Sequence, residues 1–333
     1  MKLSAIGEFG FIARFSPPFL KDLASGSMGI GDDCAVIPWQ EGASLLVTTD
    51  MLVEDIHFLR KRIPPRDLGY KSLAVNLSDI AAMGGAANSA YLSLGIPPDV
   101  EVEWLDEFFI GLRELADKWE VRLLGGDTTR SPGPLIINLA VLGRAENRRL
   151  KYRSSARVGD IIAVTGLLGD SAAGLMILLE DRELDEDAAF LLNCHHRPSP
   201  GLAEGVWLAD WEEVHAMMDV SDGIDSDLQR IMERSRCGAR VILDDLPLSD
   251  LLRQSALRYG WKALELAAAG GEDYCLLTTI APEAFSGIQD NFQERFGKPL
   301  YRIGVVTEKE EGLCYLLSGK PSVLSKTGFN HFS

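Results

Sequence analysis

Basic residues, paired cysteines and long apolar runs are scarce or missing in this sequence of 333 residues. The five cysteines are scattered and odd in number, and no two of them form a CxxC pair, so the sequence favours neither a disulfide framework nor a zinc site. Reduced thiols are the simpler interpretation, and they predict a cytoplasmic protein. Gly7 and Glu8 interrupt the first apolar residues, so we expect no signal peptide. No window is long and apolar enough to predict a membrane span.

The charge balance of the chain is strongly acidic. Lys and Arg number 33 against 49 Asp and Glu, which gives a formal net charge of −16. Nucleic acid and anionic membrane surfaces both require a basic footprint, so we expect neither as a partner. An acidic protein that binds phosphate generally needs metal cations to mediate the contact.

Three familiar motifs for calcium, nucleotides and covalent hydrolysis are missing. Residues 219–225 begin like a calcium loop, but an EF-hand needs Gly at its sixth position and Glu at its twelfth. Residues 318–322 lack the upstream glycine spacing of a Walker A loop. Residues 169–174 place their second Gly one position too far along for a nucleophile elbow. A nucleotide enzyme with this sequence would therefore have neither a P-loop nor a protein-kinase fold.

Strand-like and helix-like segments alternate along the chain, which predicts an α/β or α+β fold. The length predicts two domains, and the basic, irregular stretch 144–157 is the expected junction, with an N-terminal domain of 1–150 and a C-terminal domain of 151–333. Gly84 and Gly85 are the expected cap of a helix over 66–83. Other helices are expected at 101–119, 170–180, 228–235 and 282–296, and strands at 44–49, 89–96, 121–124, 135–142, 160–165, 214–220, 239–243 and 274–280.

Several aspartates follow apolar strand-like runs or stand in glycine turns. They are Asp32, Asp33, Asp50, Asp127, Asp219 and Asp222, and Asp79 stands on a helix just before Gly84 and Gly85. Asp beside Gly is also ordinary turn chemistry, but the arrangement recurs too often for turns alone to explain it. Ligands of open α/β sheets gather beyond the strand ends, and carboxylates concentrated there repel one another unless a cation neutralises them. Hard oxygen ligands of this kind predict Mg²⁺ sites completed by water and phosphate.

Ordered motifs carry a resemblance along nearly the whole chain. They are residues 7–9 (GEF), 29–35 (GIGDDCA), 48–53, 57–58, 71–84, 125–129 (GGDTT), 166, 169–174, 219–223 (DVSDG) and 270–274 (GGEDY). The chain resembles the thiamine-monophosphate kinase family. It is also similar to the wider group that contains aminoimidazole ribonucleotide synthetase, selenophosphate synthetase and a hydrogenase-maturation protein.

The resemblance implies a two-domain aminoimidazole ribonucleotide synthetase-like fold. In it, the N-terminal domain binds ATP and Mg²⁺ and forms a homodimer through its sheet, and the C-terminal α/β domain completes the nucleotide and substrate site. The implied reaction transfers the γ-phosphoryl group of ATP directly to thiamine monophosphate, with several Mg²⁺ ions, and yields thiamine diphosphate and ADP. Such an in-line transfer needs no covalent nucleophile.

The resemblance also implies roles for individual residues. The implied metal ligands are Asp33, Thr48, Thr49, Asp50, Asp79, Asp127, Asp219 and Asp222. The implied ATP contacts are Gly126, Asp127, Arg153 and Ser221, and the implied substrate contacts are His57, Glu272 and Phe329. The stretch 144–152 is longer than the usual connection in the family, so Arg148 and Arg149 remain alternatives to Arg153. Trp119 is either an adenine contact or part of the core.

Other functions stay open from the residues alone. One alternative is another ATP-dependent enzyme of the same group, and a second is a non-catalytic ATP-binding maturation partner. A selenophosphate synthetase would need a reactive Cys or selenocysteine near its start. Cys34 follows two aspartates and leads into an apolar run, which is typical of a buried small residue.

Overall fold

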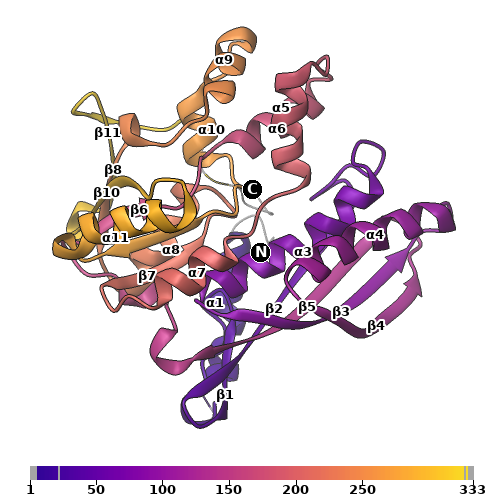
Figure 1. Ribbon diagram of the computed structural model, residues 1–333, viewed down its shortest axis with the longest axis horizontal. Helices are drawn as coiled ribbons and strands as arrows, with labels where there is room; N and C mark the ends of the chain where they lie inside the picture. Colours follow the sequence, from indigo (N-terminus) through magenta and orange to yellow (C-terminus); the bar gives the residue numbers. More distant parts are fainter. Residues whose placement is uncertain (1–5, 22, 326–327, 329–333) are drawn as a thin grey trace.

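The computed structural model describes residues 6–21, 23–325 and 328. The described chain forms two sheets, each with its own helices, and helix α3 (Pro65–Ala82) contacts strands of both (Figure 1). This mixed arrangement of helices and sheets confirms the predicted fold class. None of the described helices is long and apolar enough to cross a membrane.

The N-terminal sheet has the spatial order β1-β2-β5-β3-β4. β3 and β4 are parallel, and the other neighbours are antiparallel. The strands are β1 (Ala35–Gln40), β2 (Ala43–Val53), β3 (Ala86–Ile96), β4 (Arg122–Arg130) and β5 (Ile136–Glu146). Helices α3 and α4 (Val102–Lys118) pack together on one side of this sheet (Figure 1). We refer to the side under α3 as the inner face and to the opposite side as the outer face.

The two-residue period of β2 divides its side chains between these faces. Leu46, Thr48 and Leu52 are buried on the inner face, whereas Thr49 and Met51 are exposed on the outer face. Consecutive residues of the same motif therefore point to opposite sides of the sheet.

The four predicted strands of the N-terminal sheet are all longer than predicted, and β2 and β4 show why. β2 does not stop at Asp50, because it pairs with β5 residue by residue until Val53 meets Ile136. β4 does not stop before its glycines, because its pairing with β3 continues to Arg130. Backbone pairing with a neighbouring strand overrides the local turn signals of Asp and Gly. Asp50 and Asp127 therefore lie inside strands rather than at their ends.

Helix α3 confirms the predicted segment 66–83 and its glycine cap. Gly84 adopts the left-handed conformation with φ of 71°, and the N–H of Gly85 donates to the carbonyl of Ile80 at 3.0 Å. Both features are typical of a helix that ends in a Schellman motif. Nearly all of α3 is buried, because it packs against β2 and β5 on one side and against the C-terminal half of the chain on the other.

The C-terminal sheet has the order β12-β11-β8-β10-β6-β9-β7. Its strands are β6 (Ile161–Val164), β7 (Val214–Asp219), β8 (Gly238–Ile242), β9 (Leu276–Ile280), β10 (Tyr301–Thr307), β11 (Leu313–Leu317) and β12 (Lys320–Ser322). The helices of this half are α5 (Asp170–Leu179), α6 (Glu186–His196), α7 (Leu202–Ala209), α8 (Ile224–Ser235), α9 (Asp250–Tyr259), α10 (Ala263–Ala269) and α11 (Pro282–Phe296).

Strands β6, β7 and β9 of the C-terminal sheet are buried on both faces, and alternate residues of β6 enter different cores. Ile161 and Ala163 join the core that α7, α11 and the N-terminal half share. Ile162 and Val164 join a second core with α5, α6 and α8. Short elements that the sequence analysis did not predict include β1, α6, α7, α9, α10 and the N-terminal helices α1 (Gly7–Phe15) and α2 (Pro17–Leu20).

The connection between the sheets covers residues 147–160 and is largely irregular. It contains two short 3₁₀ turns, η2 (Asn147–Arg149) and η3 (Arg153–Ser155). Arg144 to Glu146, which we expected in the irregular stretch, belong to β5 instead because they pair with both β2 and β3 or with β2 alone. A domain division at residue 150 stays a prediction.

Candidate active site

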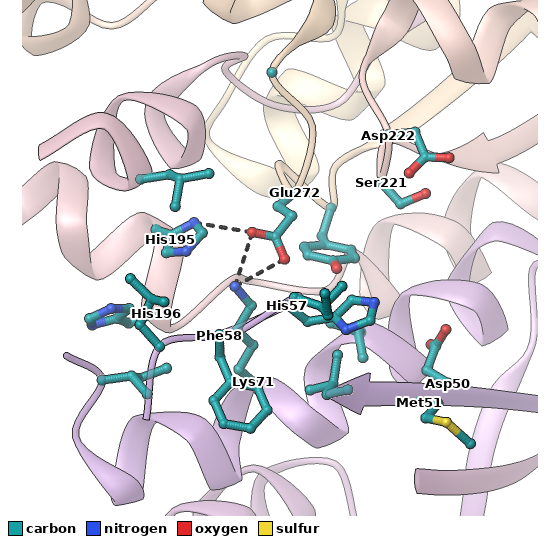
Figure 2. A pocket seen from close by; sticks show the side chains of 18 of the residues that line it. Asp50, Met51, His57, Phe58, Lys71, His195, His196, Ser221, Asp222 and Glu272 are labelled. Carbon is teal, nitrogen blue, oxygen red and sulfur yellow. Dashed lines mark hydrogen bonds and ion pairs between the residues drawn. The ribbon is translucent and has the colours of Figure 1, made fainter. Parts of the chain in front are cut away.

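A cavity of about 580 Å³ lies where the two halves of the chain meet (Figure 2). One end is acidic and polar, with Asp50, Ser221 and Asp222 on its wall. The other end is largely apolar and carries side chains of α5 and of the segment before α3, including Ile63 and Leu178. A cavity with these two ends suits a ligand that has an organic part and a charged, metal-binding part.

Three aspartates from distant parts of the chain gather near the acidic end. Asp33 lies in the turn before β1, Asp79 in the last turn of α3, and Asp219 at the end of β7. One carboxylate oxygen of each lies within 4.8 Å of one oxygen of the other two. The hydroxyl of Thr48 donates to the carboxylate of Asp79. Asp79 also lies near the negative end of the α3 dipole, which adds to the unfavourable charge.

Burial and mutual repulsion raise the pKa values of this group. Burial, followed by the charge of Asp33, raises the pKa of Asp219 to about 8. Burial and the charge of Asp222 raise the pKa of Asp50 to about 6. Burial, together with the charges of Asp50 and Asp219, raises the pKa of Asp79 well above its ordinary value. A bound cation would lower these pKa values and would allow Asp50, Asp79 and Asp219 to be ionised at the same time.

Arg153 is the arginine of the basic junction that reaches this group. Its guanidinium donates to both oxygens of Asp33, at 3.0 and 2.5 Å, and its backbone N–H points at Asp32. Arg148 instead pairs with Glu146, and Arg149 pairs with Asp210. Arg153 also lines the cavity, so the geometry favours it over the two alternatives as a ligand contact.

The turn between β7 and α8 carries Ser221 and Asp222 into the cavity (Figure 2). The carboxylate of Asp227, in the first turn of α8, accepts a hydrogen bond from the backbone N–H of Asp222. Asp227 is buried, and burial with the nearby charge of Asp222 raises its pKa well above the ordinary value. The turn therefore adds further acidic groups to the same end of the cavity.

His57 and Glu272 both line the cavity and come from different halves of the chain (Figure 2). The Nδ1 atom of His57 accepts a hydrogen bond from the N–H of Val53 at 3.0 Å, which fixes the ring on the loop after β2. Glu272 accepts from Lys71 at 3.0 Å and contacts His195 at 3.1 Å. Lys71, His195, His196 and Asp227 had no predicted role. The sequence contains one hint of these residues: Lys71 stands among apolar residues of α3, and a buried lysine requires a partner.

Thr49, Gly126 and Asp127 do not join this site within one chain. Met51, Asn138, Ser93 and Asp127 form one row across the sheet, three strand spacings long, so Asp127 is about 14 Å from β2. Asp127 is exposed, and its carboxylate accepts from the N–H of Thr128. Gly126 has a structural reason to be glycine, because an added Cβ would lie 1.7 Å from the carbonyl oxygen of Leu92.

Two other predicted contacts lie apart from the cavity or beyond the described chain. Trp119 packs against the core and borders a different hollow near α7, so the structure favours the core interpretation. Phe329 lies outside the described residues. Cys34 is 2% exposed, and burial raises the pKa of its thiol well above the ordinary value, which confirms the prediction of a buried small residue.

Family models for the AIR synthase related protein match the chain in two parts. The model of the N-terminal domain matches residues 31–145, and the model of the C-terminal domain matches residues 157–315. The first match covers almost all of the N-terminal sheet, and the second covers most of the C-terminal sheet. The fold and the carboxylate-lined cavity thus define a two-domain protein of the AIR synthase related class.

Curated relatives narrow the class further. Thiamine-monophosphate kinase of Escherichia coli (strain K12) is 43% identical over 332 residues, which are 99% of each chain. The Bacillus subtilis (strain 168) enzyme of the same name is 35% identical and covers 98% of this chain and 99% of its own. The solved structure of AaThiL complexed with AMPPCP and TMP has a TM-score of 0.85, with 32% identity and 99% coverage of both chains. This chain belongs to the thiamine-monophosphate kinase family, and the resemblance read from its motifs is confirmed.

Proposed function

We propose that this chain transfers the γ-phosphoryl group of ATP to the phosphate of thiamine monophosphate and releases thiamine diphosphate and ADP. The observation that carries the proposal is the cavity with one acidic and one apolar end, in a chain of this family. The apolar end suits the rings of thiamine, and the acidic end suits phosphate groups accompanied by cations.

The described residues fit Mg²⁺. Carboxylate and hydroxyl oxygens are the ligands that Mg²⁺ prefers, and the close approach of Asp33, Asp79 and Asp219 calls for a cation. Asp50 and Asp222 extend the set toward the cavity, and Thr48 is bonded to Asp79. When bound, Mg²⁺ offsets the repulsion between two phosphate chains and the charge that develops during transfer.

Side chains and backbone groups of the protein bind and orient the two substrates. Arg153 balances Asp33 and contributes a positive charge to the phosphate end. Ser221 stands just before the N-terminus of α8, where free N–H groups favour an anion. His57 and Glu272 face the ring end, where the carboxylate balances the positive charge of the thiazolium. Direct transfer needs no covalent nucleophile, which agrees with the buried state of Cys34.

We further propose a cytoplasmic homodimer that pairs through the outer face of the N-terminal sheet. Ile37, Met51 and Tyr91 leave 45%, 54% and 41% of their surface exposed, although all three are large and apolar. Exposed apolar residues that share one face are typical of a protein interface. In a dimer, Gly126 and Asp127 of one copy would approach the site of the other, which accounts for their distance from Asp50 within one chain. The domain division near residue 150 belongs to this proposal.

The test is direct synthesis. Purified protein is incubated with ATP, Mg²⁺ and thiamine monophosphate, and thiamine diphosphate is measured by chromatography. We expect product with thiamine monophosphate and none when thiamine replaces it, because the acceptor is a phosphate. Bound ATP without any product would refute the proposal and would favour a non-catalytic maturation partner.

A further inference from the structure

Lys71 is a buried lysine in the middle of α3. Its side chain is 1% exposed, which is rare for lysine and requires a partner. Its Nζ atom lies 3.0 Å from each carboxylate oxygen of Glu272, as the two dashed lines in Figure 2 show. The pair joins the two halves of the molecule, because α3 packs on the N-terminal sheet and Glu272 lies just before β9.

His195, at the end of α6, is the second residue that holds Glu272. Its Nδ1 atom lies 3.1 Å from the carboxylate and 3.2 Å from the hydroxyl of Ser171. Burial, followed by the charge of Lys71, lowers the pKa of His195 well below its ordinary value, so the ring is neutral. We assign its one N–H to Nδ1 because a carboxylate there needs a donor.

The turn that presents Glu272 is strained. Glu272 and Tyr274 have φ angles of 57° and 49°, which non-glycine residues rarely adopt. Two hydrogen bonds hold the turn against the segment before α8, from the N–H of Glu272 to Ser221 at 2.7 Å and from the N–H of Tyr274 to Val220 at 2.8 Å. Strain that the surroundings maintain is concentrated at functional sites. The position of this carboxylate is therefore controlled from three sides.

We propose that Lys71 is a positioning residue that holds the Glu272 carboxylate toward the cationic ring system of the substrate and does not itself bind the substrate phosphate. This inference rests on the proposed function. Lys71 and the neutral His195 occupy one side of the carboxylate, and Glu272 remains 27% exposed toward the cavity. A carboxylate has about four acceptor positions, so lone pairs remain for a ligand.

The placement of Lys71 separates this role from phosphate binding. Figure 2 shows its ammonium beside the Glu272 carboxylate, on the side of the cavity away from Asp50 and Asp222. The phosphate end is lined instead by Arg153, Asp50 and Asp222. With 1% exposure, the Lys71 side chain lacks the freedom to reach across the cavity.

The experiment measures the affinity of the full-length protein for thiamine and for thiamine monophosphate by calorimetry. Lys71→Met removes the ammonium and keeps the length of the side chain, Lys71→Arg restores a cation, and Glu272→Gln removes the carboxylate charge. The exposed Lys309→Met is the matched control for loss of a lysine. We expect Lys71→Met to weaken both ligands by the same factor, about tenfold, and Lys71→Arg to recover part of the loss. In the Glu272→Gln background, the same change should alter affinity less than about threefold.

Three outcomes would overturn the inference. Weakened binding of thiamine monophosphate with unchanged binding of thiamine would assign Lys71 to the phosphate. Equal losses in the presence and absence of the Glu272 carboxylate would show that the two residues act independently. A lower unfolding temperature with unchanged affinity would leave Lys71 a purely structural role. A wild-type protein that binds thiamine but makes no thiamine diphosphate would refute the proposed reaction and leave this inference standing.

Discussion

The inner and outer faces of the N-terminal sheet carry side chains of different character. On the inner face, Thr48 and Asp50 point toward α3 and the cluster of Asp33, Asp79 and Asp219 beside the cavity. On the outer face, Thr49 accepts a hydrogen bond from Asn138, and Met51 and Tyr91 are exposed. Residues that follow each other in one motif therefore meet different surroundings. The inner face thus carries oxygen ligands of the proposed metal site, and the outer face carries the exposed apolar side chains of the proposed interface.

The largest effect should come from the inner face. Asp50→Asn removes one carboxylate from the acidic end, so we expect kcat to fall by about 10²–10³-fold through lost metal binding and charge stabilisation. The metal-free variant should unfold at the same temperature as the wild type or higher, because one repelling charge is gone. Steady-state kinetics and thermal unfolding check both parts. Wild-type kcat in this variant would remove Asp50 from the site.

The outer face is tested by breaking the proposed dimer. Tyr91→Arg should convert the dimer into a monomer, measured by sedimentation equilibrium, and should lower activity by at least about tenfold if Asp127 acts across the interface. A mixture of inactive Asp50→Asn and Asp127→Asn proteins should then regain about a quarter of the wild-type activity, because half of the dimers would contain one complete site. A mixture without recovered activity would place Asp127 in the site of its own chain or outside it.

The pH dependence of stability tests the buried carboxylates near the inner face. The folded protein raises the pKa of Asp219 to about 8 and of Asp50 to about 6, so it holds protons that the unfolded chain releases. The resulting stabilisation of the metal-free protein is complete below about pH 4 and is lost as the pH rises toward 8. Mg²⁺ should therefore raise the unfolding temperature more at pH 8 than at pH 5, by about 5 °C. An equal gain at both pH values, or the same pH slope in Asp219→Asn, would contradict this cause.

The smallest effects compare two neighbouring threonines. Thr48→Val and Thr49→Val each replace a hydroxyl by a methyl group of similar size, on opposite faces of the sheet. We expect Thr48→Val to lower kcat about tenfold, since its hydroxyl bonds to Asp79, and Thr49→Val to change kcat less than about threefold. Reversed effects would mean that the Thr49 hydroxyl, and not that of Thr48, serves the metal site.

Much of the fold was predictable because local signals agreed with the tertiary structure. The helix over 66–83 has apolar periodicity and a glycine cap, and the structure places its end at Ala82. The ends of β2 and β4 were not predictable from local signals, because pairing with β5 and β3 determines where these strands stop. Asp and Gly inside a strand look like a turn until the neighbouring strand is known.

The arrangement of the site residues was also only partly predictable from local sequence signals. The aspartates were recognisable by their surroundings in the sequence, but their grouping depends on contacts between residues as far apart as Asp33 and Asp219. The two-residue period of a strand predicts that Thr48 and Thr49 lie on opposite faces of the sheet. A comparison of motifs alone gives both threonines the same role. The pairing of Lys71 with Glu272 joins positions 201 residues apart, so no local pattern could reveal it.

Helix α3 carries both Lys71 and Asp79, eight residues apart, on one rigid element. At 1.5 Å per residue, their backbone positions are about 12 Å apart along the helix axis. If Lys71 and Asp79 act as proposed, this spacing sets the distance between the position of the ring and the position of the phosphate. We therefore expect a substrate analogue with a longer or shorter arm between ring and phosphate to engage one end of the cavity at the expense of the other.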